Sequence, residues 1–439
     1  MLFGVLIVLV FLVLAGLMMT RKMPALLALP VMAVAIGFIA GLAAHLPWTA
    51  IATDGGKAPP NMRDFIFQTI LTDGSSRLAG AIMFAVFGAI LSQVVMRQGI
   101  AQRIVRVAAE YAGDRKMALA CFMTAAVALV FMSLTGLGAV IMVGSLALPI
   151  MIGAGIAPSL AACLMLFGIS IGGCFNMANM GVYKDVLKLD EATLRQFAVA
   201  YGSMLAATAA VFLVFQARKE SRRFSWALDL GGESGPQVPP LALVTPLVPI
   251  GLILALGWPV IPSFIVGVLF GLLTTEPKRV IPNLTACVLE GLKDMSPVIG
   301  LFIGIGMVLN AMMDPTTKEV MAPFITAIVP HTAGGFVLFF TLLAPLALYR
   351  GPLNFIGLGA GFAGLVLSNN LLPPAAVMAA FLGVGQVQGV CDPTNTHNVW
   401  IAQFTHTSTE ELMKKTLPFV WIFVLLALTY AAAIGKVMP

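Results

Sequence analysis

Residues 385–400 of the chain read GQVQGVCDPTNTHNVW, a polar stretch that follows a long apolar run. Two glutamines, an aspartate, two threonines, two asparagines and a histidine fall within these sixteen residues. An apolar helix that reaches so many polar groups has to end there. Irregular backbone persists at membrane depth only where protein or a polar cavity surrounds it. The stretch therefore predicts a helix break that forms half of a solute-binding site.

The composition indicates an all-α polytopic membrane protein. The chain has 439 residues, of which 59% are hydrophobic and 10% are charged, whereas a soluble domain carries about a quarter charged residues. The net charge of +6 fits basic loops beside a lipid bilayer better than a nucleic-acid partner. The five cysteines form no CxxC pair, so neither a disulfide framework nor a zinc site is predicted. No cofactor is expected.

Apolar windows of membrane-spanning length, about twenty residues, occur in two sets. The first set comprises 2–20, 24–46, 78–96, 159–174 and 195–216, with two apolar arms at 117–132 and 137–155. The second comprises 241–256, 258–274, 296–313, 374–390 and 416–435, with arms at 333–348 and 355–371. Shorter amphipathic segments lie at 64–72, 97–116 and 283–294. We therefore predict a first repeat at 1–217, a cytoplasmic linker at 218–240 and a second repeat at 241–439.

The two sets form an internal repeat. Four residues around the first break recur 217 residues later, and at the same offset Tyr183 falls on Trp400. The four pairs are Gly168 and Gly385, Gly172 and Gly389, Cys174 and Cys391, Val182 and Val399. Five crossings per half are an odd number, so the second half enters the membrane with opposite orientation. The basic loops then all lie in the cytoplasm, and the N-terminus lies outside. Inverted-topology repeats are typical of secondary transporters, which bind substrate near the midplane at broken helices.

Two long stretches carry a resemblance to a known group. GLGAVIMVGSLALPIMIGAGIAPSLAACLMLFGISIGGCFNMAN and IGLGAGFAGLVLSNNLLPPAAVMAAFLGVGQVQGVCDPTN resemble the ion transporter superfamily. The opening MTRKMPALLALPVMAVAIGFIAG looks most like its citrate symporter and gluconate permease branches. The resemblance implies a homodimer in the bacterial inner membrane, with a scaffold domain and a mobile transport domain that contains two hairpins. It also implies a small organic anion driven by protons or sodium.

The Ser-Asn-Thr signature that related dicarboxylate carriers have at the hairpin tips is absent, which leaves the coupling ion and the substrate class open. We predict that the arm junctions and the two breaks together supply the substrate-binding residues, which are Ser133, Thr135, Asn176, Asn179, Arg350, Asn354, Thr394, Asn395 and Thr396. Neutral amides and hydroxyls suit a hydrated organic anion or a partly dehydrated cation. The alternative interpretation is that these groups satisfy one another where a helix ends.

The coupling ion is assigned to Asp392, His397 and Asn398. An ionised carboxylate at membrane depth is costly unless it is paired, protonated or bound to a cation. Asp392 therefore holds a sodium ion or carries a proton, or else forms an Asp-Pro turn or helix cap at the membrane surface. His397 is either a proton relay or an ordinary hydrogen-bonded histidine. No other metal site is expected.

Arg350 is the one charged residue at either arm junction. If the arms are re-entrant hairpins, its guanidinium lies at a tip and can bind a carboxylate in a bidentate manner. If the arms are two full crossings, Arg350 is a cytoplasmic flanking residue. The leading hypothesis is symport of citrate, a dicarboxylate or a sugar acid, and the alternative is a cation/proton antiporter. An enzyme is disfavoured because HExxH, GxSxG and paired intramembrane carboxylates are all missing.

Overall fold

The computed structural model describes residues 2–20, 22–46, 61–113, 115–219, 238–351 and 353–438, and the side chains of residues 19, 217–219 and 350 lie outside the described part. The described residues form helices and no strand. The first half contains α1 (Leu2–Met19), α2 (Ala25–His45), α3 (Met62–Asp64), η2 (Phe65–Asp73), α4 (Gly74–Ser76), α5 (Ala79–Arg97), α6 (Ile100–Ala112), α7 (Lys116–Phe131), α8 (Gly136–Gly153), α9 (Pro158–Phe175), α10 (Met177–Leu187) and α11 (Glu191–Lys219).

The second half repeats this order. It contains η3 (Pro240–Leu247), α12 (Val248–Leu256), α13 (Val260–Thr275), η4 (Pro277–Arg279), α14 (Val280–Met313), α15 (Pro315–Ile328), α16 (Ala333–Leu343), η5 (Ala344–Arg350), α17 (Leu358–Ser368), α18 (Pro374–Cys391), α19 (Thr396–Phe404) and α20 (Thr409–Ala433). Eight helices of the described chain are long and apolar enough to cross a membrane, and shorter apolar helices add to them. The predicted membrane class is confirmed.

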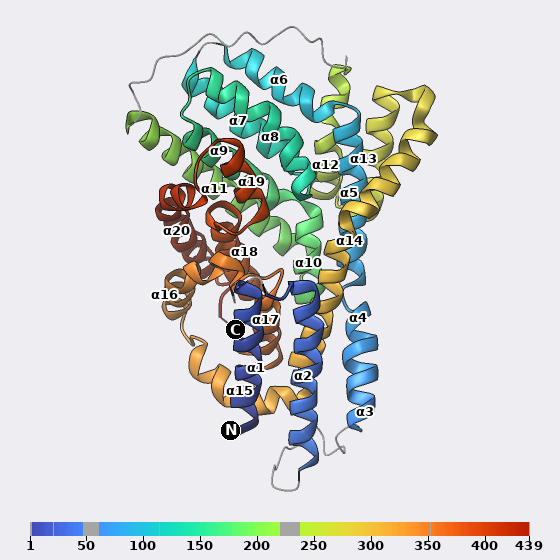
Figure 1. The fold of residues 1–439 in the computed structure, drawn as a ribbon, viewed down its shortest axis with the longest axis vertical. Coiled ribbons are helices and arrows are strands. Elements are labelled where there is room, and N and C mark those ends of the chain that lie inside the picture. The colour runs from blue at the N-terminus through green and yellow to red at the C-terminus, as the bar shows by residue number, and fades with distance from the viewer. Residues whose placement is uncertain are drawn as a thin grey trace.

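The elements of the two halves correspond one to one, and the predicted inverted repeat describes the fold. The pair α1–α2 corresponds to α12–α13, the rod α3–α5 to α14, and the connecting helix α6 to α15. The arm pair α7–α8 corresponds to α16–α17, the broken helix α9–α10 to α18–α19, and α11 to α20. In Figure 1 the arms α7 and α8 lie in the upper part and α17 lies in the lower part, so the two pairs approach from opposite ends. The predicted boundaries stay a prediction, because residues 220–237 lie outside the described chain.

The structure corrects two predicted separations. The amphipathic piece at 64–72 and the span at 78–96 form one 36-residue segment, Met62–Arg97. Likewise, the piece at 283–294 and the span at 296–313 form the single 34-residue helix α14. Both amphipathic pieces precede their spans without a chain-reversing turn, so helical hydrogen bonding continues through them. Figure 1 shows α5 and α14 side by side along much of the molecule.

Glycines and polar pairs hold these two rods together. A Cβ on Gly306 would collide with the backbone oxygen of Gly74, and a Cβ on Gly291 would lie 3.0 Å from the backbone nitrogen of Ile90. Small residues thus allow the close backbone approach that membrane helices use for packing. The side chain of Gln93 donates to Asp294 at 2.6 Å, and Arg77 donates to Asn310 at 2.5 Å.

The arm pairs are re-entrant, because each junction reaches the break of a crossing helix rather than the end of one. The carbonyls of Phe131 and Leu134, at the end of α7, accept hydrogen bonds from Asn176 between α9 and α10. The backbone N–H of Tyr349, at the end of η5, donates to Asp392 between α18 and α19. The second arm pair is preceded by α15, which is bent by 93° from the helix that follows it. The predicted hairpins are therefore present in both halves.

The close approach of the rods gives a stability prediction. We expect Gly306→Ala to destabilise the protein by about 1–3 kcal/mol, the usual cost of overpacking, because the new methyl group would collide with backbone. The thermal unfolding midpoint of the detergent-purified protein measures this effect. Gly251→Ala in α12 is the matched control, since its Cβ would meet nothing within 4 Å. Equal unfolding midpoints for the two variants would contradict the packing described above.

Candidate functional site

The second break is organised by one buried carboxylate. Asp392 has 0% exposure and follows the last residue of α18. Its Oδ1 accepts hydrogen bonds from the backbone N–H of Tyr349 at 3.0 Å, the backbone N–H of Thr394 at 2.8 Å and the Thr394 hydroxyl at 2.8 Å. The carboxylate thus joins the tip of the second hairpin to the loop between α18 and α19. The hydrogen bond from the Thr394 N–H is also the local turn that the alternative interpretation expects, so both interpretations of Asp392 stay predictions.

Tyr349 adopts an unusual backbone conformation to make this contact. Its φ is +57° and its ψ is +31°, the left-handed region, which few residues other than glycine adopt. The conformation interrupts η5 and turns the backbone N–H towards Asp392. Its side chain is 44% exposed and lines a cavity described below. Such a conformation costs free energy and persists only where the surrounding structure holds it.

The remaining polar residues of the second break mostly support the start of α19. Asn395 is the N-cap and accepts from the backbone N–H of His397 at 3.3 Å, while its amide donates to the Gln388 carbonyl at 3.4 Å. Asn398 donates to the Val390 carbonyl at 3.2 Å. Its Oδ1 is buried without a hydrogen-bond partner. Thr396 is exposed, and His397 lies partly buried in the first turn of α19.

The first break has the same architecture with a neutral centre. Asn176 is 2% exposed, and its Oδ1 accepts from the backbone N–H of Ala178 at 3.0 Å. Its Nδ2 donates to the carbonyls of Phe131 at 3.2 Å and Leu134 at 3.1 Å. All its hydrogen-bonding capacity towards the first hairpin is therefore used within the protein. Asn179 makes a longer bond, 3.4 Å, to the Gly173 carbonyl.

The first hairpin tip separates two of the predicted residues. The Ser133 hydroxyl donates to the Pro246 carbonyl at 2.7 Å, so Ser133 attaches the tip to η3. Thr135 precedes α8 as its N-cap residue but makes no cap hydrogen bond, and its buried hydroxyl has no partner. The first N–H groups of a helix have no intrahelical acceptor. In the described chain, the α8 N-terminus therefore keeps uncapped donors.

The second hairpin tip contains Arg350 and Asn354. The Arg350 side chain lies outside the described part, so its predicted role stays a prediction. Asn354 is 8% exposed, and its backbone carbonyl accepts from the N–H of Gly359 at 2.8 Å. The Asn354 amide lies 3.7 Å from the position that a Cβ on Gly357 would take. The tip backbone is thus folded tightly around Asn354.

A cavity of about 540 Å³ adjoins both hairpins. It lies between the α1–α2 loop, the α8 N-terminus and α19, and its lining residues are Met18, Met23, Pro24, Ala25, Leu137, Tyr349, Thr394, Thr396, Val399, Trp400 and Gln403. The volume falls in the range of small-molecule sites, roughly 300–1,000 Å³. The structure thus brings Thr394 and Thr396 to the cavity together with the first turn of α8. Asn176, Asn395 and Ser133 do not line it.

Aromatic residues of the short helices cross between the halves. Tyr183 of α10 stacks on Phe355 of the second hairpin, with ring centroids 4.5 Å apart and planes 3° apart. Trp400 of α19 packs on Gly144 of α8 in the first hairpin, where a Cβ would lie only 3.0 Å from its Cη2 atom. These two residues are the pair that the 217-residue offset relates. Each half therefore supplies an aromatic ring that packs against the hairpin of the other half.

Sequence reasoning missed the part of the cavity formed by the α1–α2 loop. Met18, Met23, Pro24 and Ala25 carry no polar signal that distinguishes them from other residues at the end of a span. Tyr349 precedes the recognised Arg350, but only its positive φ reveals its role. Trp400 was detectable, because the repeat pairs it with Tyr183. Among the described residues, no group of three His, Cys, Asp or Glu side chains can hold a metal ion.

Comparisons with known proteins support a transporter fold. No protein-family model and no curated protein matches the chain. The Alcanivorax borkumensis YdaH transporter, described as having an unusual topology, matches with a TM-score of 0.63 at 15% identity, over 93% of this chain and 97% of that one. Neisseria gonorrhoeae MtrF, described as illuminating a class of antimetabolite efflux pumps, matches with a TM-score of 0.63 at 11% identity, over 94% and 95%. Identities this low show the fold alone. They support a multi-pass membrane transporter fold, not the citrate and gluconate branch.

The two asparagines of the first break predict unequal effects. We expect Asn176→Ala to cost about 2–3 kcal/mol, because it leaves two buried carbonyls and one buried N–H without partners. We expect Asn179→Ala to cost less than about 1 kcal/mol, since it removes one long hydrogen bond. Thermal unfolding in detergent measures both variants. If the two cost the same, Asn176 does not hold the hairpin tip in place.

Proposed function

We propose that the protein is a secondary active transporter that carries a small organic carboxylate together with a cation, by alternating access. The observation that carries the proposal is the meeting of two features at one cavity. An uncapped helix N-terminus, that of α8, reaches it through Leu137. The second hairpin tip, held by the buried Asp392, reaches it through Tyr349. One feature suits an anion, and the other suits a coupled cation.

The anion is assigned to the α8 N-terminus. Backbone N–H groups and the helix dipole favour negative charge at this end of a helix. A Cβ added to Gly136 or Gly138 would have no other atom within 4 Å. A ligand can therefore approach the backbone closely at these two residues. Thr394 and Thr396 supply hydroxyl groups to the lining of the same cavity. Citrate, a dicarboxylate or a sugar acid has the matching chemistry.

The coupling ion is assigned to Asp392. A proton or a sodium ion at this carboxylate would change the charge at the point where the second hairpin is attached. Asn398 adds a buried oxygen without a partner on the next helix. We place His397 beside this site as a second titratable group. The resemblance to the citrate and gluconate branch, the homodimer and the bacterial inner membrane belong to the same proposal.

The alternative is a cation/proton antiporter of the same superfamily. It uses Asp392 in the same way but gives no role to the open N-terminus of α8. Both structural neighbours are described as a transporter or an efflux pump, so transport rather than catalysis is the common expectation.

Uptake by proteoliposomes tests the proposal. The purified protein is reconstituted, a proton or sodium gradient is imposed, and entry of radiolabelled citrate, succinate or gluconate is followed. We expect gradient-dependent accumulation of at least one of the three. Cation/proton exchange in the absence of any organic solute would favour the antiporter. No carboxylate uptake under either gradient would overturn the symport proposal.

A charge placed at the α8 N-terminus should block the anion. We expect Gly138→Asp to lower carboxylate uptake by about tenfold or more, because the new carboxylate repels the substrate at close range. Gly138→Asn has nearly the same shape without the charge and serves as the matched control, with most of the uptake retained. If both variants transport equally well, the α8 N-terminus does not bind the anion.

Neutralising Asp392 should uncouple transport without unfolding the break. In Asp392→Asn, the amide oxygen can still accept the hydrogen bonds from Tyr349 and Thr394, so the hairpin stays attached. We expect gradient-driven accumulation to be lost while the thermal unfolding midpoint changes little. Accumulation that remains at the level of the unmodified protein would remove Asp392 from the coupling mechanism.

A further inference from the structure

The α1–α2 and α12–α13 pairs correspond in the inverted repeat, and each lies beside a cavity. One is the cavity of about 540 Å³ between the α1–α2 loop and α19. The other lies where the corresponding α12–α13 hairpin meets α10, the counterpart of α19. There, only about 30 Å³ of free space remains, enough for one or two waters. At the offset of 217 residues, Val399, Trp400 and Gln403 of the open cavity fall on Val182, Tyr183 and Val186 of α10, which are buried. One place is therefore open, while the corresponding side of α10 is closed.

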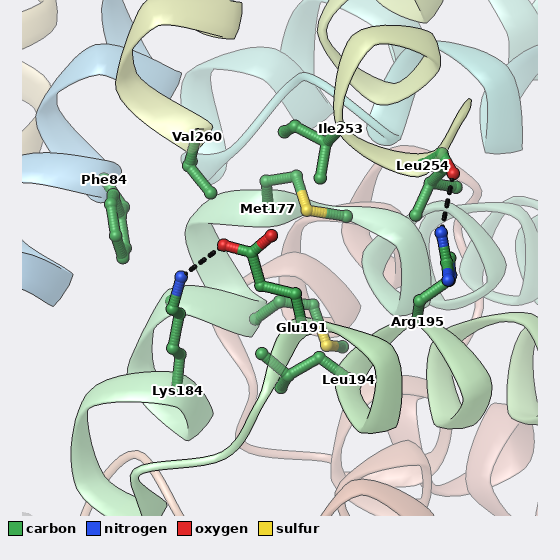
Figure 2. Close-up of a pocket in the computed structure, with 11 residues that line it drawn as sticks. Phe84, Met177, Lys184, Glu191, Leu194, Arg195, Ile253, Leu254 and Val260 are labelled. Atoms are coloured by element: carbon green, nitrogen blue, oxygen red, sulfur yellow. Dashed lines mark hydrogen bonds and ion pairs between the residues drawn. The ribbon is translucent and has the colours of Figure 1, made fainter. Parts of the chain in front are cut away.

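Figure 2 shows what fills the closed place. Apolar side chains pack between the elements, among them Phe84 of α5, Met177 and Met180 of α10, and Ile253 of α12. Below them in Figure 2, Lys184 of α10 donates to Glu191 of α11 at 2.6 Å. Arg195, one turn further along α11, donates to the backbone carbonyl of Leu254 at 2.9 Å.

The contact made by Arg195 joins α11 to the C-terminus of α12. The last carbonyls of a helix have no intrahelical donor and carry the negative end of the helix dipole. Leu254 lies two residues before the end of α12, so a guanidinium is a well-matched partner. Asp185 of α10 makes a second link of this kind, because its carboxylate accepts from the backbone N–H of Ala81 near the start of α5.

The ion pair lies at the solvent-facing mouth of the closed place. The side chains of Lys184 and Glu191 are 32% and 47% exposed. Glu191 begins α11 directly after Asp190, whose carboxylate accepts from the backbone N–H of Thr193 at 3.0 Å. Hydrogen bonds from the hydroxyl and the backbone N–H of Thr193 lower the pKa of Asp190.

The three charges are not repeated at the positions related by the 217-residue offset. At the offset of 217 residues, Lys184, Glu191 and Arg195 fall on Ile401, Ser408 and Leu412. The repeat thus conserves the backbone arrangement and changes the side chains. The contacts of Lys184, Glu191 and Arg195 therefore have no direct equivalent at these three positions.

We propose that Lys184, Glu191 and Arg195, with the Leu254 carbonyl, form a latch that holds the α10–α12 route shut while the α1–α2 route is open. The inference rests on the alternating access of the proposed function and assigns one of its two states to this structure. In the orientation expected from the basic loops, the latched route is the external one. Loss of the latch shifts the population towards the opposite state, because the two states are then closer in free energy.

Thiol accessibility tests the latch without requiring a known substrate. The exposed Cys121 is replaced by serine, and the other four cysteines are buried. Met180→Cys then reports on the latched route and Gln403→Cys on the open one, each in nanodiscs with a hydrophilic maleimide. Before the latch is altered, we expect Gln403→Cys to react at least about tenfold faster, since Met180 is 3% exposed and reaction requires opening.

The latch variant is Arg195→Ala, and Arg103→Ala on the distant α6 is the matched control that also removes an arginine. We expect Arg195→Ala to raise labelling of Met180→Cys about fivefold to tenfold and to lower labelling of Gln403→Cys. Glu191→Gln should act in the same direction, and Arg103→Ala should leave both rates unchanged.

Unchanged rates in both latch variants would overturn the proposal. So would a rise at both cysteines together, since that indicates local loosening rather than exchange between two states. Thermal unfolding confirms that each variant is folded. If uptake assays detect no carboxylate transport, the proposed substrate fails, while opposite changes at Met180→Cys and Gln403→Cys still support the latch.

Discussion

The structure depends on one constraint, that polar backbone exposed by a break in a membrane helix must find a partner inside the protein. In the first half, the Asn176 amide provides the link, with two hairpin carbonyls and one helical N–H as its partners. In the second half, Asp392 accepts two backbone N–H groups and one hydroxyl. Each break therefore needs its hairpin, and each hairpin needs its break. The tips cannot move independently of the broken helices, which makes these elements one mechanical unit around the cavity.

In each half, one polar side chain joins the helix break to the hairpin tip. That side chain is an amide in the first half and a carboxylate in the second. An amide has no charge to gain or lose, so the attachment through Asn176 is insensitive to protons and cations. A buried carboxylate is sensitive to both, because its charge has to be balanced in a medium of low dielectric constant. The asymmetry is built into otherwise equivalent positions at the ends of α9 and α18. The proposed function therefore assigns ion coupling to the second hairpin, while the first hairpin presents a helix N-terminus.

Much of the fold could be predicted from the sequence, because apolar length and glycine spacing dictate it directly. The offset that joins Gly168 to Gly385 and Tyr183 to Trp400 correctly identified the repeated breaks. The site was less predictable. Ser133 and Thr135 are two residues apart, yet one bonds to the scaffold at Pro246 and the other lies unpaired at the α8 N-terminus. Which way a tip residue points depends on packing between segments more than a hundred residues apart. The cavity wall formed by Met18 and Pro24 carries no chemical signal at all.

The proposed latch depends on the matching backbones of the two halves and on the side chains that differ between them. In the proposed alternating access, two halves with matching backbones give two states of similar free energy, since the contacts that open one route close the other. Side chains that differ between the halves then decide which state is populated. In this proposal, Lys184, Glu191 and Arg195 stabilise closure of the α10–α12 route, while Trp400 packs on Gly144 beside the open one. A ligand that enters the open cavity and draws Tyr349 and Leu137 together would have to supply free energy comparable to these few contacts. Under the proposed function, the surface charges at the ends of α10 and α11 set the free energy that substrate binding must exceed.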